Sequence, residues 1–281
     1  MTWWQAVVLG VVEGITEYLP VSSTGHLVLT AWLLGLDHPG NKEALDAYLV
    51  VVQGGAILAV LGLYAPRVLQ MARGLGGRDD DGRRLAFNIA LAFVPAATVG
   101  ALLGTLIKTW LFSALPVLAA LAVGGLWMIW LGRGVRRGGD VTTLSVAAAL
   151  GIGCFQVLAL WPGMSRSMVT IIGGMLFGLN PVAAAEFSFL LGVPTLGAAC
   201  LHDLAGNLGD AASGAAPSMV AQFGLGHLML GFGVATVSAA LAVRWLVAFL
   251  TRHGLAPFGW YRLVLSATLA ALLLTGILHI E

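Results

Sequence analysis

The chain has 281 residues, of which 59% are hydrophobic and only 10% are charged. A soluble domain carries about 25% charged residues, so this composition excludes a soluble globular protein whose whole surface faces water. The formal net charge is +1, and because no basic stripe is present, nucleic-acid binding is not expected.

Hydrophobic stretches close to 20 residues long follow one another, which is the length that an α-helix needs to cross a bilayer. Six of them predict full spans: Ala47 to Tyr64, Leu85 to Ile107, Leu115 to Leu131, Ala184 to Leu201, Met219 to Val243 and Trp260 to His279. Two other regions, residues 1–36 and 144–180, are long enough to cross, but a polar cluster with proline and glycine interrupts each. The chain is therefore predicted to be a single all-α integral membrane domain, residues 1–281.

Two smaller features concern processing and packing. Cys154 and Cys200 lie in apolar segments, so they are expected to be packing residues rather than a disulfide or a metal site. The first residues, which include Trp3 and Trp4, contain no basic region, and a cleaved signal peptide is not expected.

The distribution of arginine predicts the orientation of the spans. Arginine-rich connections alternate with arginine-poor ones: Arg67 to Arg84, Arg133 to Arg137 and Arg244 to Arg252 against Leu36 to Asp46, Lys108 to Ala114 and Asp203 to Ser218. With the first set in the cytoplasm, the spans alternate correctly only if each interrupted region returns to the side that it entered from. Both are therefore predicted to be re-entrant helical hairpins, the first entering from outside and the second from inside.

The two hairpins begin two predicted repeat halves, about 1–132 and 144–279. Each half is one hairpin followed by three spans, and because three is odd, the halves have opposite topology. The segment Pro20-Val21-Ser22-Ser23-Thr24-Gly25 aligns with Pro162-Gly163-Met164-Ser165-Arg166-Ser167. Inverted repeats with broken helices place the functional site near the bilayer midplane, so the polar residues of the two breaks are expected to converge there.

The breaks contain ionisable residues, Glu13, Glu17 and His26 in the first and Arg166 in the second. Such groups at membrane depth are costly, by about 2.5–3.5 kcal/mol each on insertion scales. One explanation is structural, with buried ion pairs that merely hold the hairpins in place. That explanation accounts for Arg166 and one glutamate, but not for a second glutamate, a histidine and several hydroxyls in the same site.

The alternative explanation is anion binding. Pro20 and Pro162 suit the first turn of a helix, where the missing N–H costs nothing. Each is predicted to begin a half-helix whose unpaired backbone N–H groups favour phosphate. Arg166 adds a planar fork that can hold phosphate bidentately. Hydroxyl groups are expected to bind the same anion, namely those of Ser22, Ser23, Thr24, Ser165 and Ser167.

Glu13 and Glu17 are four residues apart and therefore lie on one face of the first half-helix. Two carboxylates would repel a diphosphate, so either one of them is protonated or a hard divalent cation bridges carboxylate and phosphate oxygens. The cation, Mg²⁺ or Ca²⁺, is the favoured alternative.

Ser23 and His26 are three residues apart, one turn on a helix predicted to begin near Pro20. This spacing fits a serine nucleophile with an imidazole base or acid, and it equally fits a histidine that activates water. Three polar residues within or beside apolar runs are expected to complete the hydrogen bonds of the site: Gln53, Gln156 and Glu186.

The two motifs, Glu-Gly-Ile-Thr-Glu-Tyr-Leu-Pro-Val-Ser-Ser-Thr-Gly-His at 13–26 and Pro-Gly-Met-Ser-Arg-Ser at 162–167, resemble the signatures of the BacA/UppP family of bacterial undecaprenyl-diphosphate phosphatases. The resemblance covers essentially the whole chain and implies six spans plus two re-entrant hairpins. Met168 stands where the family usually has a glycine. The family's essential and phosphate-binding residues correspond here to Glu13, Glu17, Ser23, His26 and Arg166, with Ser22, Ser165, Ser167 and Thr170 as neighbours.

The resemblance implies hydrolysis of the C55 isoprenoid diphosphate to the monophosphate carrier used in cell-wall synthesis. It also implies a divalent cation, a bacterial inner-membrane location with a pocket open to the periplasm, and bacitracin resistance on overproduction. A transporter or flippase for the phosphorylated prenyl carrier is the alternative, because inverted repeats with broken helices are typical of transporters. The Ser23 and His26 pair favours the phosphatase, and the sequence is compatible with a homodimer.

Overall fold

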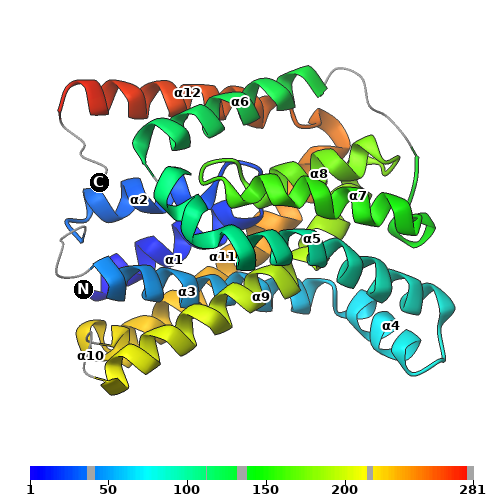
Figure 1. Cartoon of the computed structure of the whole chain (residues 1–281), viewed down its shortest axis with the longest axis horizontal. Coiled ribbons are helices and arrows are strands. Elements are labelled where there is room, and N and C mark those ends of the chain that lie inside the picture. Colours follow the sequence, from blue (N-terminus) through cyan, green and yellow to red (C-terminus); the bar gives the residue numbers. More distant parts are fainter. Residues whose placement is uncertain (37–41, 112, 132–137, 214–217, 277–281) are drawn as a thin grey trace. The chain divides into compact units, whose positions relative to one another are not determined.

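The structure, a computed structural model, describes residues 1–36, 42–111, 113–131, 138–213 and 218–276. The regular secondary structure in these ranges is helical, apart from an isolated bridge between Gly139 and Leu179, and Figure 1 shows the helices coloured in chain order. They are α1 (Trp3–Tyr18), α2 (Ser23–Leu33), α3 (Lys42–Leu63), α4 (Ala65–Leu75), α5 (Asp80–Leu111), α6 (Ala114–Leu131), η2 (Val141–Thr143), α7 (Val146–Val157), η3 (Leu158–Leu160), α8 (Arg166–Leu176), α9 (Pro181–Ser213), α10 (Met219–Phe223), α11 (Leu225–His253) and α12 (Ala256–Leu274).

Six of the described helices, α3, α5, α6, α9, α11 and α12, are long and apolar enough to cross a membrane. A helix satisfies its backbone hydrogen bonds internally, which hydrocarbon requires. The predicted all-α membrane class and the six predicted spans are therefore confirmed. The chain is a multi-pass membrane protein.

Several span limits differ from the prediction. Helix α9 continues to Ser213, so most of the predicted loop Asp203 to Ser218 is helical. The span predicted from Met219 begins at Leu225 instead, because Gly224, with φ of 85°, ends the short helix α10. The predicted end of the last span, His279, lies outside the described residues.

Two of the predicted arginine-rich connections also differ. Arg244 and Arg252 belong to α11 and not to a connection. The connection Arg67 to Arg84 overlaps the amphipathic helix α4, which the prediction missed. A Cβ atom added to Gly74 would lie 2.0 Å from the backbone nitrogen of Arg83, so α4 and α5 form a tight hairpin. The connection Arg133 to Arg137 lies outside the described residues.

Both cysteines are free, as expected. Cys200 donates through Sγ to the carbonyl of Val50 at 2.9 Å. Cys154 is exposed rather than packed, so its predicted role as a packing residue is wrong; its side chain is on a surface of α7.

The chain divides into two compact units. The first comprises Met1–Tyr18, Ser23–Leu63 and Val193–Arg244, and the second comprises Leu19–Ser22, Tyr64–Gly192 and Trp245–Glu281. Each unit draws on both predicted repeat halves, and the inverted repeat itself stays a prediction. Each unit is described separately below.

In the first unit, α1 and α2 contact each other as the two arms of a hairpin. Gln5 Nε2, near the start of α1, donates to the carbonyl of Leu34 just after α2 at 2.9 Å, so the hairpin ends where it began. At 1.5 Å per residue, α1 is about 24 Å long and α2 about 17 Å, both shorter than the roughly 30 Å of a hydrocarbon core. Pro20 lies in the break, and α2 begins three residues later than predicted, because Ser22 adopts a φ of 75° that no right-handed helix contains.

Glycines allow α11 to approach α1 and α3 closely. A Cβ atom on Gly14 would lie 2.4 Å from the carbonyl oxygen of Ala235, and one on Gly55 would lie 2.3 Å from that of Phe232. Side chains at these two positions would force the helices apart. The glycines therefore fix α1 and α3 on the same neighbour, α11.

In the second unit, α7 and α8 form another hairpin whose ends meet. The backbone nitrogen of Gly139, before α7, donates to Gly178 at 3.2 Å, and that of Asn180, after α8, donates to Gly139 at 3.1 Å. With about 18 Å and 17 Å of helix, these arms are also too short to span. Helix α8 begins at Arg166, four residues after Pro162, so the predicted helix start is again wrong; Ser165, with φ of 72°, delays it.

Helices α6 and α12 run side by side in the second unit (Figure 1). Two glycines let them approach closely. A Cβ atom on Gly125 would lie 2.8 Å from the carbonyl oxygen of Gly259, and one on Gly259 would lie 2.6 Å from that of Gly125. One turn further along α12, at Arg262, this close approach brings a charged side chain against α6.

Candidate active site

The carboxylates of the first motif are buried on α1. Glu13 is 1% exposed and Glu17 is 6% exposed, and both lie on the buried face of the helix, as their spacing predicted. Glu17 Oε2 accepts a hydrogen bond from Ser23 Oγ at 2.7 Å and another from Gln53 Nε2 at 2.8 Å. The structure therefore brings Glu17, Ser23 and Gln53 together within the first unit.

Ser23 is the first residue of α2, and His26 follows one turn later in the same helix, as predicted. Both side chains are half-buried, whereas Thr24 between them is exposed. The Ser23 hydroxyl donates to the Glu17 carboxylate, so a base is in contact with this alcohol. The spacing in the sequence pointed only to His26 as the partner of Ser23, and it did not reveal this bond.

The second break ends at the N-terminus of α8. Ser165 is the N-cap, and its Oγ accepts a hydrogen bond from the backbone nitrogen of Met168 at 3.3 Å. Ser165 Oγ and Ser167 Oγ are 3.1 Å apart. Arg166 is the first residue of the helix, where the first backbone N–H groups have no partner within the helix. This end of the second unit has the donors that an anion requires.

Helix α9 sets the orientation of Arg166. Its Nη1 donates to the carbonyl of Ser188 at 3.0 Å, and a Cβ atom on Gly192 would lie 2.8 Å from the same Nη1. Thr170 Oγ1 and Ser188 Oγ, both fully buried, are 2.6 Å apart. Ser188 and Gly192 thus hold the guanidinium against α9, and neither residue was identified from the sequence.

The tips of the two breaks belong to the same compact unit. Ser167 Oγ, 1% exposed, donates to the carbonyl of Leu19 at 2.9 Å, which joins α8 to the segment Leu19–Ser22. Ser22 and Ser165 are the only non-glycine residues with positive φ in the described ranges. A positive φ strains an ordinary residue and is often found at functional sites. Both breaks therefore enter their second helix through a strained serine.

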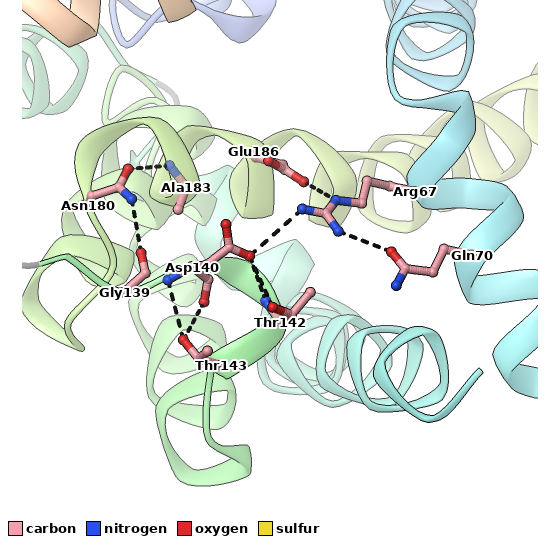
Figure 2. Close-up of polar contacts among 9 residues, drawn as sticks. All are labelled: Arg67, Gln70, Gly139, Asp140, Thr142, Thr143, Asn180, Ala183 and Glu186. Atoms are coloured by element: carbon pink, nitrogen blue, oxygen red, sulfur yellow. Dashed lines mark hydrogen bonds and ion pairs between the residues drawn. The ribbon is translucent and has the colours of Figure 1, made fainter.

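Two residues expected to support the site have different outcomes. Gln156 is buried in α7, at 1% exposure. Glu186 lies in α9, but its Oε1 accepts a hydrogen bond from Arg67 Nε at 2.7 Å (Figure 2). Arg67 also approaches Asp140 at 3.7 Å and donates to Gln70 at 3.0 Å. Glu186 is thus part of an ion-pair network with Arg67 of α4 and Asp140 beside η2, and its expected supporting role at the site stays a prediction.

The donor atoms of α1 suit a hard cation, because Mg²⁺ and Ca²⁺ prefer carboxylate oxygens. Glu13 and Glu17 are the two carboxylates that could hold such an ion. The described side chains contain no group of three or more His, Cys, Asp or Glu arranged for a metal. A cation here would therefore need oxygens from substrate or water to complete its coordination, as Mg²⁺ commonly does.

Comparisons with known proteins decide the family. The family described as Bacitracin resistance protein BacA matches residues 6–268. The undecaprenyl-diphosphatase of Sorangium cellulosum is 47% identical over 95% of this chain and 85% of its own length. Those of Cereibacter sphaeroides and Deinococcus radiodurans are 42% and 41% identical, over 96% and 99% of this chain and 97% and 98% of their own lengths.

The chain belongs to the BacA family.

Met168, which stands where the resemblance predicts a glycine, is accommodated against α6. It is fully buried, and its sulfur would lie 2.9 Å from a Cβ atom on Gly124 of α6. Arg262 reaches the same glycine and is also fully buried. Sequence reasoning passed over Arg262, although an arginine inside a predicted span is itself a signal of function.

Proposed function

We propose that this protein hydrolyses undecaprenyl diphosphate to undecaprenyl phosphate and inorganic phosphate. The observation that carries the proposal is the hydrogen bond from Ser23 Oγ to buried Glu17 at 2.7 Å, because an alcohol with an adjacent base is the arrangement of an activated nucleophile. The names of the related proteins supply the substrate. The inner membrane of a bacterium and access from the periplasmic side are part of the same proposal, and the arginine distribution supports this orientation.

In the proposed reaction, Ser23 Oγ attacks the terminal phosphorus while its proton passes to Glu17. The bond between this phosphorus and the bridging oxygen breaks, and undecaprenyl phosphate leaves with the electron pair. Water then attacks the phosphorus of the phosphoserine, with His26 accepting a proton of the water. The bond between this phosphorus and Ser23 Oγ breaks, Ser23 Oγ takes back the proton from Glu17, and inorganic phosphate is released. Direct attack by water activated by His26 is the competing mechanism.

The remaining motif residues would bind and neutralise charge. Arg166 presents a guanidinium to the phosphate oxygens, and the N-terminus of α8 with Ser165 and Ser167 adds hydrogen-bond donors. Ser22, Thr24 and Thr170 are proposed as further phosphate-binding residues. A divalent cation held by Glu13 and Glu17 would supply additional positive charge beside the diphosphate.

Phosphate release from undecaprenyl diphosphate in detergent tests the activity, since no gradient exists there and transport alone releases none. We expect Ser23→Ala to lower kcat by about a thousandfold or more, while Thr268→Ala, whose hydroxyl bonds only within α12, keeps normal activity. A phosphoserine trapped by rapid acid quench supports serine attack. An active Ser23→Ala enzyme would favour attack by water, and absence of release by the wild-type protein would refute the proposed function.

A further inference from the structure

Arg262 is a fully buried cation in the membrane-spanning helix α12. The described residues include no acidic side chain that forms an ion pair with it. A buried charge is strongly destabilising unless other polar groups solvate it. The proposed mechanism does not use Arg262, so its presence in α12 needs a separate explanation.

The guanidinium is solvated by four backbone carbonyl groups. On one side, Nε donates to Leu121 at 3.3 Å and Nη2 donates to Ala120 at 2.9 Å, both in α6. On the other side, Nη1 donates to Met164 at 3.2 Å and Nη2 donates to Gly163 at 2.8 Å. Arg262 therefore joins two continuous spans to the broken segment between η3 and α8.

The fork shape of arginine suits these four acceptors. Gly163 and Met164 lie where the helix is interrupted, and Gly163 has a φ of 91°. Carbonyl groups released by a helix break need new donors, because the surrounding hydrocarbon supplies none. Arginine offers five N–H donors in a fixed plane, whereas lysine offers three on a point charge. A lysine at this position could not reproduce the four bonds in the same geometry.

The backbone that Arg262 holds leads directly into the anion-binding end of α8. Met164 is followed by Ser165, with its strained φ of 72°, and then by Arg166. A strained backbone persists only when its surroundings over-determine it. The hydrogen bonds from Arg262 to the carbonyl groups of Gly163 and Met164 constrain the backbone directly before Ser165.

We propose that Arg262 is a positioning residue, whose guanidinium holds Gly163 and Met164 so that Arg166 and the N-terminus of α8 face the phosphate groups of the substrate. This inference rests on the proposed function for its substrate, a lipid diphosphate. Among the described residues, the hydrogen bonds of Arg262 go to backbone carbonyl groups, so it acts through the break.

The test compares Arg262→Lys and Arg262→Met with Ser266→Ala in purified protein. Ser266 is the matched control, because it also lies in α12 and donates to an α6 carbonyl, Leu118 at 3.0 Å, but does not touch the break. We expect kcat/KM of both Arg262 variants to fall at least about tenfold, since small misplacements of binding groups slow catalysis. Inhibition by inorganic phosphate should weaken in parallel. Ser266→Ala should keep normal kinetic constants even where its melting temperature falls.

Normal kcat/KM and normal phosphate inhibition in folded Arg262→Lys or Arg262→Met would overturn the proposal, whatever happens to the melting temperature. If neither variant folds, Gly124→Ala replaces them, because its new methyl carbon would lie 2.4 Å from Arg262 Nη2 and would displace the guanidinium. Its control is Gly104→Ala, which meets no atom within 4 Å. Kinetics of Gly124→Ala equal to those of Gly104→Ala would refute the positioning role.

The proposed function and the positioning role can fail separately. A wild-type protein that releases no phosphate from any prenyl diphosphate refutes the former. Stabilisation of the folded protein by inorganic pyrophosphate, measured as a rise in melting temperature, still tests the latter. Arg262→Lys should show a smaller rise than Ser266→Ala, and an equal rise would count against the proposal.

Discussion

At the scale of single residues, two serines combine a strained backbone with a polar side chain. Ser22 and Ser165 have φ values of 75° and 72°, and each immediately precedes the first residue of a helix. A positive φ costs an ordinary residue roughly 1–2 kcal/mol relative to glycine. Because glycine is permitted there at no such cost, the presence of serine at both positions favours a use for the hydroxyl group.

A pair of substitutions separates strain from side-chain chemistry at Ser22. Both Ser22→Gly and Ser22→Ala remove the hydroxyl, but only alanine retains the strained Cβ. We expect the glycine variant to be more stable than the alanine variant by about 1 kcal/mol, measured by denaturant unfolding in detergent. Equal stabilities would mean that the φ of this residue relaxes in the variants and stores little strain.

Gly192 leaves the space that the Arg166 guanidinium occupies beside α9. We expect Gly192→Ala to raise KM and to lower kcat/KM by about tenfold or more, because its Cβ would lie 2.8 Å from Arg166 Nη1. Steady-state phosphate release measures the effect. Gly197→Ala in the same helix meets nothing within 4 Å and should behave as the wild type; equal effects of the two variants would exclude a specific contact with Arg166.

At the scale of elements, the second hairpin is held by polar contacts at its ends. Asn180 Nδ2 donates to the carbonyl of Gly139 at 3.0 Å, and Asn180 Oδ1 accepts from the backbone nitrogen of Ala183 at 2.9 Å (Figure 2). Asp140 caps η2 through a capping box with Thr143. These bonds keep the chain entering α7 beside the chain leaving α8, which two short helical arms could not ensure by themselves.

The Arg67 and Glu186 ion pair connects α4 to α9 in the same region. Its side chains are 29% and 16% exposed, so solvent screens them only in part. A double-mutant cycle with Arg67→Ala and Glu186→Ala should give a coupling energy of about 1 kcal/mol. The control pair, Arg83 with Asp80 in α5, is 64% and 92% exposed and should show no measurable coupling. A coupling energy of zero for Arg67 and Glu186 as well would mean that this ion pair does not stabilise the fold.

At the scale of the whole molecule, the described hairpins predict that both ends of residues 1–36 lie on one side of the membrane. After Cys154 and Cys200 are replaced, Thr2→Cys and Leu33→Cys should react with an impermeant thiol reagent from the same side. Glu43→Cys, at the start of the spanning helix α3, and Gly76→Cys, just after α4, should react from opposite sides. Labelling of positions 2 and 33 from opposite sides would show that the first region crosses the bilayer.

Local properties of the sequence determined the class of the protein, the number of spans and the place of the two breaks. Hydrophobic length, arginine distribution and the spacing of Glu13 and Glu17 depend on neighbours a few residues away, so a sequence reveals them directly. The helix starts after Pro20 and Pro162 were mispredicted because a proline permits a first turn without requiring one. Strained serines in the folded backbone moved both starts.

Only the tertiary structure decided which distant groups became partners. Arg262 bonds to Met164 across 98 positions of the chain, and Glu186 bonds to Arg67 across 119. Such pairs depend on how closely helices approach, which glycines such as Gly125 and Gly259 control through the absence of a side chain. A buried charge must find donors or acceptors, but its sequence neighbours do not specify which of them the packing will supply.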